Sequence, residues 1–294
     1  MILFSDPTSI VEDKLFPQKY TLQIKGRLVI WDEPQIIGIL NLTPDSFFAG
    51  SRVKPTRDEI LKKAESMILE GADILDLGGY SSRPGAEHIS LEEELDRIIK
   101  PIQWISEQFP EILISVDTFR SQVAKESIEA GAHLINDISG GSLDEKMYEV
   151  VGKLNVPYFL MHMKGTPQNM QEKTDYGKLL PEILNYFAKK LHIIKEFGIK
   201  DVIIDPGFGF AKSLEQNYQI LRNLEIFKTL SHPILVGLSR KSMIYKLLGS
   251  SPEESLNGTT ALHMFALSKG ANILRVHDVK EANETRKLFK QLYA

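Results

Sequence analysis

The sequence contains no cysteine among its 294 residues, so a disulfide framework and a thiolate-ligated zinc site are both excluded. Long apolar runs are missing too. No segment approaches the roughly 20 consecutive apolar residues that a membrane-spanning helix needs, and residues 1–13 lack the apolar core of a secretion signal. We therefore expect a cytoplasmic protein with no membrane partner.

An excess of positive charge is missing as well. The 35 Lys and Arg residues are outnumbered by 39 Asp and Glu residues, which leaves a net charge of −4. Nucleic-acid-binding domains normally carry a basic surface, so we expect no nucleic-acid partner. The chain has the composition of a globular protein, with 43% hydrophobic and 25% charged residues. Its length suits one α/β barrel, and we expect residues 1–294 to form a single domain.

Apolar runs alternate with amphipathic helical patterns along the chain. Residues 21–31 predict a β-hairpin that turns at Lys25-Gly26. The predicted strands that follow are 36–40, 72–79, 112–117, 133–137, 156–162, 201–205, 233–237 and 272–276. Three predicted helices are marked by their first residues: a capping box at Thr56 and Glu59, Ser90 with Glu93, and Ser142 with Glu145. The other predicted helices cover 123–130, 179–197, 217–230, parts of 241–269, and the end of the chain to about 293.

The strands are near-continuous apolar runs, which indicates a parallel sheet covered by helices on both faces. Eight strand–helix units predict an α/β fold, a (β/α)8 TIM barrel, with the hairpin as an N-terminal extension. A doubly wound open sheet is the alternative, but it usually has a glycine-rich loop after its first strand, and residues 41–45 (NLTPD) are not such a loop. A weak repeat (GADILD, GAHLIND, GIKDVIID, GANILRV) at strands 2, 4, 6 and 8 supports the barrel.

Polar side chains stand at almost every strand end, where a barrel places its active site. Asp117, Asn136, Asp205 and Lys241 together suit a flat heterocycle with donors and acceptors on its edge. The strands that carry Asn41, Arg275 and His277 become neighbours when the barrel closes, and this seam suits a phosphate, with a magnesium ion at Asn41. Arg83 and residues 239–242 are basic and suit a carboxylate.

Other polar residues have a structural interpretation. Asp76 is as consistent with bracing its loop as with contacting a ligand. Asp137 is suited to capping or to orienting Asn136. His162 lies between two methionines with no carboxylate or second histidine at ligand spacing, which indicates a packed wall rather than a metal site.

Eight motifs match one known family in its own order. They are GILNLTPDSF (38–47), GGYSSRPGA (78–86), SVDTF (115–119), INDISGG (135–141), MHMKGTP (161–167), DPGFGFAKS (205–213), GLSRKSMI (237–244) and RVHDV (275–279). In these motifs the chain resembles dihydropteroate synthase. That family is a TIM barrel that joins 6-hydroxymethyl-7,8-dihydropterin diphosphate to p-aminobenzoate with help from magnesium, and it releases diphosphate and 7,8-dihydropteroate for folate synthesis.

The resemblance implies a role for each matching residue. Asp117, Asn136, Asp205 and Lys241 would hold the pterin, and Met161 would line its pocket. Asn41 would bind magnesium and, with Arg275 and His277, the diphosphate. Ser82, Arg83, Phe210 and Ser242 would contact p-aminobenzoate. Asp205, Lys241 and Arg275 would be the catalytic residues. The family commonly forms homodimers and is the target of sulfonamides.

Three positions depart from the family pattern. Tyr80-Ser81-Ser82 replaces the usual Glu-Ser-Thr, Ala49 replaces an acid in the loop after Phe47, and Ala211 replaces a glycine. Ser82 keeps the hydroxyl. Two alternatives remain. One is the pterin-binding barrel of a methyltetrahydrofolate-dependent methyltransferase, but residues 239–242 and 275–277 argue against it. The other is a catalytically inactive pterin-binding barrel, which only Ala49 and Tyr80 favour.

Overall fold

Eight apolar segments of the chain form one parallel sheet, as the uninterrupted apolar runs predict. The computed structural model describes residues 19–43, 55–81 and 88–293. The strands of the sheet are β3 (Gln35–Asn41), β4 (Ile74–Gly78), β5 (Leu113–Asp117), β6 (Leu134–Asp137), β7 (Tyr158–Met161), β8 (Val202–Asp205), β9 (Leu235–Val236) and β10 (Ile273–Val276).

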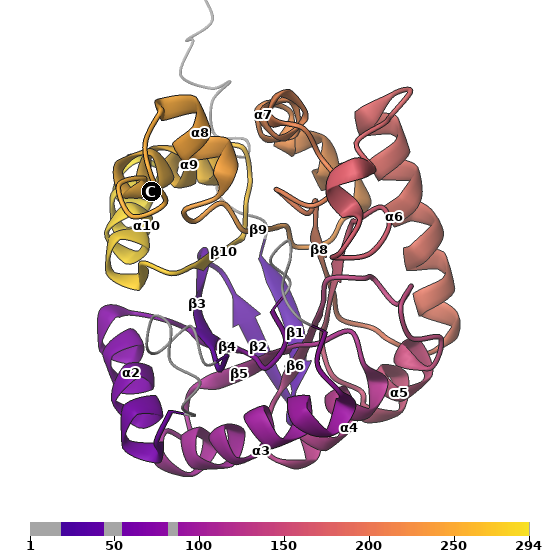
Figure 1. Ribbon diagram of the computed structural model, residues 1–294, viewed down its shortest axis with the longest axis vertical. Coiled ribbons are helices and arrows are strands. Elements are labelled where there is room, and N and C mark those ends of the chain that lie inside the picture. Colours follow the sequence, from indigo (N-terminus) through magenta and orange to yellow (C-terminus); the bar gives the residue numbers. More distant parts are fainter. Residues whose placement is uncertain (1–18, 44–54, 82–87, 294) are drawn as a thin grey trace, which may run out of the picture.

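The sheet closes on itself. Its strand order is β8-β7-β6-β5-β4-β3-β10-β9. The two end strands meet through a parallel bridge between Ile204 and Ile234, where the Ile204 amide donates to the Pro233 carbonyl at 2.9 Å. Figure 1 shows the helices arranged as a ring around these strands. The predicted (β/α)8 barrel is confirmed, and the open-sheet alternative is wrong.

Helices follow each strand of the sheet from β3 on, and α10 comes after the last strand. They are α2 (Arg57–Glu70), α3 (Leu91–Gln108), α4 (Ser121–Glu129), α5 (Met147–Leu154), α6 (Leu179–Glu196), α7 (Leu214–Arg222), α8 (Ser242–Leu248), α9 (Leu256–Ser268) and α10 (Val279–Tyr293), with two 3-10 segments, η2 (Met170–Glu172) and η3 (Leu224–Leu230). Thr56 and Glu59 form the predicted capping box, and the Ser90 hydroxyl accepts from the Glu93 amide at 3.1 Å. None of the described helices is both long and apolar enough to cross a membrane.

Two predicted helices have different limits. Ser142 and Glu145 do not open α5, which begins only at Met147. The residues before it form turns because the Asp144 carboxylate accepts from the backbone amides of Ser121 and Lys146 at 2.7 and 2.9 Å.

The helix predicted over 217–230 is two segments. α7 begins earlier, with a capping box at Ser213 and Gln216, and ends at Arg222. Asn223 ends it because its side-chain amide donates to the Gln219 carbonyl at 2.8 Å, and the 3-10 segment η3 follows.

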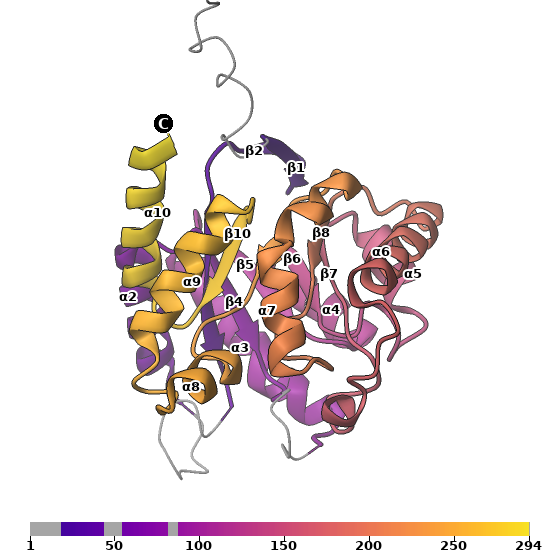
Figure 2. The same cartoon turned by 90° about the horizontal axis from the view of Figure 1, so that it is seen from above.

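The N-terminal hairpin covers one end of the barrel. Its strands, β1 (Tyr20–Ile24) and β2 (Arg27–Trp31), are antiparallel. Leu22, Ile24 and Trp31 are buried in one cluster with the first inward side chains of the barrel strands. The cluster's barrel members are Ile37, Ile74, Leu134, Phe159, Ile203, Leu235 and Ile273. The Asp201 carboxylate, just before β8, accepts from the Gln23 amide at 2.8 Å. Figure 2 shows the hairpin at the end of the barrel opposite α8, so the carboxyl ends of the strands remain as the functional face.

Trp31→Ala should lower the free energy of unfolding by about 3–5 kcal/mol, because it leaves a cavity under the barrel. The catalytic constants of the folded variant should stay within about twofold of the wild type, since the site lies at the other end. Urea denaturation and steady-state kinetics at 25 °C measure both. The control is Ile30→Ala on the same strand, because Ile30 is 63% exposed and Trp31 only 4%. A Trp31→Ala loss no larger than that of the control would contradict the packing role of the hairpin.

Candidate active site

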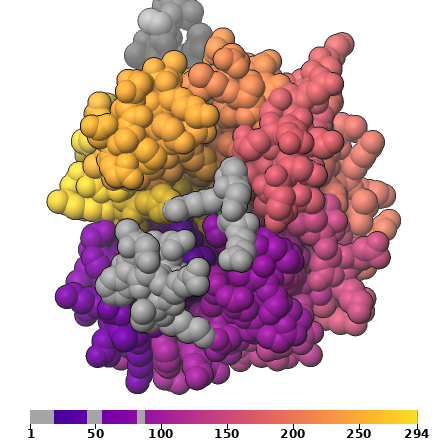
Figure 3. Space-filling model, viewed as in Figure 1, coloured from indigo at the N-terminus to yellow at the C-terminus, as the bar shows by residue number. Residues whose placement is uncertain are grey.

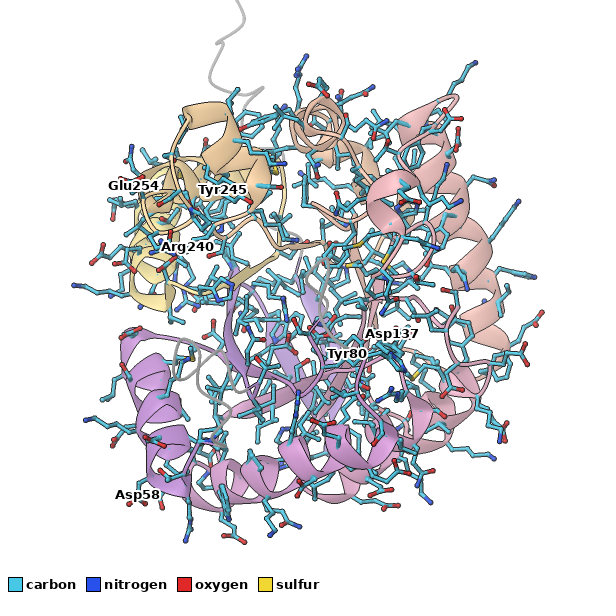
Figure 4. All side chains as sticks on the ribbon, viewed as in Figure 1. Asp58, Tyr80, Asp137, Arg240, Tyr245 and Glu254 are labelled. Atoms are coloured by element: carbon cyan, nitrogen blue, oxygen red, sulfur yellow. The ribbon has the colours of Figure 1, made fainter. Side chains whose placement is uncertain are left out.

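A cavity of about 1080 Å³ opens at the carboxyl ends of the strands. Its walls come from the ends of β3 and β10, from the loops after β4, β8 and β9, and from α8. Figure 3 shows segments from along the whole chain meeting on this face, and Figure 4 shows Tyr80 on one side with Arg240 and Tyr245 on the other. The predicted site residues that line the cavity are Asn41, Phe210, Lys241, Ser242, Arg275 and His277.

Arg275 ties three strand ends to β10 across the mouth of the barrel. Its Nε donates to Asp76 Oδ2 and its Nη2 to Asp117 Oδ2, both at 2.7 Å. The Asn136 side-chain amide donates to the same Asp76 oxygen at 3.0 Å. The side chains of Asp76 and Asp117 are 1% and 15% exposed. Two of the residues predicted to hold a heterocycle, Asp117 and Asn136, are therefore joined to Arg275, which the sequence had assigned to a separate phosphate group.

Burial and charge shift the acidity of this network. Burial raises the pKa of Asp117 to about 7; Arg275 opposes the shift, and the neighbouring charge of Asp76 adds to it. Burial also works against the charge of Arg275, but Asp76 and Asp117 outweigh it and raise the pKa of the guanidinium above its ordinary value. Arg275 is thus a permanent cation, whereas Asp117 takes up a proton close to neutral pH.

Asp205 and Lys241 are a second set of opposite charges, with Asp205 buried and Lys241 half-buried. Asp205 is buried at the end of β8 and accepts from the Gly207 amide at 2.7 Å. Burial raises the pKa of Asp205, and the Lys241 ammonium is the largest opposing influence. Burial lowers the pKa of Lys241 to about 8, with Asp205 opposing. Lys241 Nζ donates to the Phe208 carbonyl and lies 4.7 Å from the centre of the Phe210 ring.

The loop after β8 places Phe210 on the cavity wall. Gly207 has a φ of +73°, and a Cβ there would lie 2.1 Å from the His162 carbonyl oxygen, so only glycine fits. The Phe210 amide donates back to the Gly207 carbonyl at 3.1 Å. Ala211 has a φ of +51°. The glycine usual in the family adopts that conformation freely, and Ala211 retains a strain of about 1 kcal/mol.

The loop after β9 is held against β10, and it presents Lys241 and Ser242 to the cavity. Arg240 donates from Nε and Nη2 to both carboxylate oxygens of Asp278 at 2.8–3.2 Å. Ser239 Oγ accepts from the His277 amide at 3.1 Å. These contacts fix the seam where the sequence predicted an anion site.

The remaining predicted site residues lie deeper in the barrel or outside the part of the chain that the structure describes. Met161 is buried in an apolar cluster with Tyr80, Phe119 and Ala211 beneath the mouth. Ser82, Arg83 and Ala49 lie outside the described residues.

Tyr80, which replaces the usual glutamate, has a packed and bonded side chain. Its hydroxyl accepts from Gln168 Nε2 at 2.9 Å and hydrogen-bonds His88 Nδ1 at 3.1 Å. Its ring meets Phe119 edge-on at 4.9 Å between centres. Tyr80 therefore links the loops after β4, β5 and β7.

The structural interpretations of Asp137 and His162 are confirmed. Asp137 is buried and accepts from the amides of Ser139 and Gly141 at 2.7 and 2.8 Å. His162 is buried against Tyr186, edge-on at 4.8 Å between ring centres. In the described part of the chain, no group of three His, Cys, Asp or Glu side chains is placed to hold a metal ion.

Three functional or supporting residues were missed or undervalued. Asp76 is the shared acceptor of Arg275 and Asn136, and its strand-end position was the available signal. Glu94 on α3 is buried and accepts from Thr118 Oγ1 at 2.7 Å and from Arg120 Nη1 at 2.5 Å; no spacing in the sequence marked it. Lys212 received no role, although it stands within the DPGFGFAKS motif.

Comparison with known proteins places the chain in a family. The family model described as pterin binding enzyme matches residues 37–277. The dihydropteroate synthase of Escherichia coli (strain K12) is 43% identical over 278 residues, which cover 94% of this chain and 95% of that protein. The chain belongs to the dihydropteroate synthase family.

Solved structures agree. The dihydropteroate synthase of Yersinia pestis in complex with a sulfonamide drug has a TM-score of 0.86 at 39% identity and covers 93% of this chain and 98% of that one. The Xanthomonas albilineans enzyme with 4-aminobenzoic acid has a TM-score of 0.87 at 36% identity and covers 94% and 99%. The expected transferase of folate synthesis is confirmed, and the methyltransferase and inactive-barrel alternatives are set aside.

The unfolding free energy of Asp117→Asn should rise relative to that of the wild type between about pH 5 and pH 8. The folded-state pKa of Asp117, about 7, lies above its unfolded value, so the folded wild type holds a proton that the unfolded chain has lost. Its stability therefore falls by about 1.4 kcal/mol per unit up to about pH 7 and levels off above it, about 3 kcal/mol in all, whereas Asn does not titrate.

Urea denaturation of the ligand-free proteins at each pH measures this difference. Asp58→Asn, on the exposed face of α2 (Figure 4), controls for the change in net charge. A stability difference between Asp117→Asn and wild type that stays constant across the range would contradict the raised pKa.

Proposed function

We propose that this chain joins 6-hydroxymethyl-7,8-dihydropterin diphosphate to p-aminobenzoate within the cavity at the carboxyl ends of its strands. The observation that carries the proposal is the placement of Arg275. Its guanidinium lies at the cavity wall between two buried carboxylates, and the same cavity is lined by Lys241, Phe210 and Ser242. Recognition groups for a heterocycle and a cation for an anionic leaving group thus meet at one point.

The pterin is assigned to the deep part of the site. Asp117, Asn136, Asp205 and Lys241 supply acceptors and donors for the edge of a flat ring. Met161 supports the ring from the apolar cluster below. Asp117 also accepts from the Arg275 guanidinium.

The diphosphate is assigned to the seam between β10 and β3, at Asn41, Arg275 and His277. A diphosphate at the seam competes with Asp117 for the Arg275 guanidinium, because both are anions that accept hydrogen bonds from the same planar donor. Binding of the diphosphate therefore releases Asp117 toward the pterin. The transfer of the Arg275 guanidinium from Asp117 to the diphosphate would thus prepare both the pterin part and the diphosphate part of the first substrate's site.

The p-aminobenzoate is assigned to the rim. The Phe210 ring packs on its ring, while Ser82, Arg83 and Ser242 hold its carboxylate. A sulfonamide, as a mimic of p-aminobenzoate, occupies the same place in this proposal.

Magnesium is assigned to Asn41. Asn41 lines the cavity beside Arg275 and His277, and the described residues hold no carboxylate cage. A single amide oxygen suits Mg²⁺, which commonly takes one or two protein ligands and otherwise binds substrate phosphate and water. When bound, the ion neutralises charge on the departing diphosphate.

The reaction then needs charge stabilisation more than proton transfer. The bond between the exocyclic methylene carbon and the diphosphate oxygen breaks, Arg275 stabilises the departing anion, and a cation forms on the pterin. Asp205 hydrogen-bonds the ring nitrogens while ionised and so favours that cation. The neutral aromatic amine attacks the methylene carbon and then loses a proton, so no general base of unusual pKa is required.

The remaining assignments concern the whole molecule. We propose that residues 1–294 act as a single domain in the cytoplasm and that the protein forms a homodimer through outer helices. Leu288 and Leu292 support the dimer, since they are 62% and 69% exposed on α10. Light scattering on the purified protein measures the assembly.

Asp205→Asn should lower kcat at least about 100-fold while the protein stays folded, because the neutral amide no longer favours the cationic transition state. Steady-state kinetics with both substrates measures this. Asp201→Asn, at the opposite end of β8, is the matched control and should stay within about twofold. Near-normal turnover of Asp205→Asn would rule out its proposed role.

With both substrates present, diphosphate release should require added magnesium, and chelation should abolish it reversibly, because the ion neutralises the leaving group. Asn41→Ala should raise the magnesium concentration needed for half-maximal rate. A coupled assay for diphosphate measures both effects. Undiminished release with chelator present would contradict the metal assignment, and no release under any condition would contradict the proposed reaction.

A further inference from the structure

Lys212 is a buried cation with an unusual set of partners. It is 4% exposed, and its Nζ lies 2.9 Å from the carbonyl oxygens of Gly207 and Phe210. The same Nζ lies 3.3 Å from the His162 carbonyl oxygen and 3.1 Å from His162 Nδ1. None of these four acceptors is a carboxylate.

Such a cation is expensive to bury. Desolvation lowers the pKa of Lys212 to about 7, opposed chiefly by the charge of Asp205. Burial lowers the pKa of His162 to about 2, so the ring is neutral and its Nδ1 accepts from the ammonium. An apolar side chain would fill this place at lower cost in desolvation. The backbone carbonyls that the ammonium binds therefore indicate its role.

The ammonium holds the turn that carries Phe210. Gly207, Gly209 and Ala211 all have left-handed φ angles of +73°, +82° and +51°, and such a loop keeps its shape only where surrounding contacts determine it. The single nitrogen Nζ of Lys212 donates hydrogen bonds to the carbonyls at both ends of the turn, those of Gly207 and Phe210. Lys212 is buried, whereas the Phe210 ring lines the cavity with Lys241 Nζ over its face.

We propose that Lys212 is a positioning residue for p-aminobenzoate, which acts by fixing the 207–210 turn and thereby the Phe210 ring. The inference rests on the proposed contact between Phe210 and p-aminobenzoate. Lys212 touches neither substrate in this scheme. Asp117 and Asn136 are held away from the turn by Arg275 and Asp76, whereas Asp205 and Lys241 hydrogen-bond the backbone of the turn at Gly207 and Phe208. We therefore expect the larger effect on the second substrate, because its ring contact is Phe210 itself.

The decisive comparison is between Lys212→Met and Lys164→Met. Both lysines place positive charge near the His162 ring. Lys164 pairs with Glu182 at 3.0 Å and donates to the Asp175 carbonyl at 2.8 Å, so it makes neither of the Lys212 contacts to the turn. Lys212→Met should raise the KM for p-aminobenzoate and the Kd of a sulfonamide about tenfold, and leave the KM for the pterin diphosphate within about twofold. Lys164→Met should change none of these by more than about twofold.

A double-mutant cycle with Phe210→Ala separates the inference from the function on which it rests. If Phe210→Ala leaves the KM for p-aminobenzoate unchanged, the proposed place of that substrate is wrong. If Phe210→Ala raises it, Lys212→Met should add less than about twofold in the Phe210→Ala background, because both changes remove the same contact. Independent, multiplying effects would overturn the inference and leave the proposed function intact.

Lys212→Gln covers the case in which Lys212→Met does not fold. Glutamine keeps hydrogen-bond donors without the charge, so it should raise the KM for p-aminobenzoate by a smaller factor than tenfold. If instead the KM for the pterin diphosphate changes and the KM for p-aminobenzoate does not, Lys212 acts through the charge on Asp205, and the inference is overturned. Equal changes in both KM values would overturn it as well.

Discussion

The guanidinium of Arg275 between Asp76 and Asp117 is the contact on which the arrangement of the site depends. The two acids stand on neighbouring strands, β4 and β5, and the charge of Asp76 adds to burial in raising the pKa of Asp117 at this end of the sheet. A cation must reach them, and it comes from β10 because closure of the barrel brings that strand beside β3, one strand away from β4. The same guanidinium lines the cavity, so the charge that stabilises the two acids is also available to a substrate.

The two ends of the barrel divide stability from function. At the closed end, the hairpin and the first inward side chains form an apolar cluster. At the open end, buried charges and left-handed loop residues accumulate around the cavity, in forms that cost stability. The cores at the closed end and around the strands therefore support a site that would not form on its own.

The departures from the family pattern have local physical explanations. Tyr80 makes contacts in three loops and packs on Phe119, so it replaces an acid with a bonded aromatic. Ala211 stands where a left-handed φ favours glycine, and contacts to the same loop, among them the Tyr176 hydroxyl to the Ala211 carbonyl at 3.0 Å, hold it there. Neither change removes a residue assigned to a substrate.

The sequence by itself determined the barrel, the order of its elements and six polar or aromatic residues that line the cavity. Continuous apolar runs require a covered parallel sheet, capping residues mark helix starts, and strand ends must meet at one face. What it could not determine was which of those polar residues pair. Asp76 and Arg275 are 199 positions apart, so only the closed barrel decides that they meet. The turns before α5 and the Lys212 contacts depend on hydrogen bonds between distant or irregular backbone segments, and no period or spacing in the sequence encodes them.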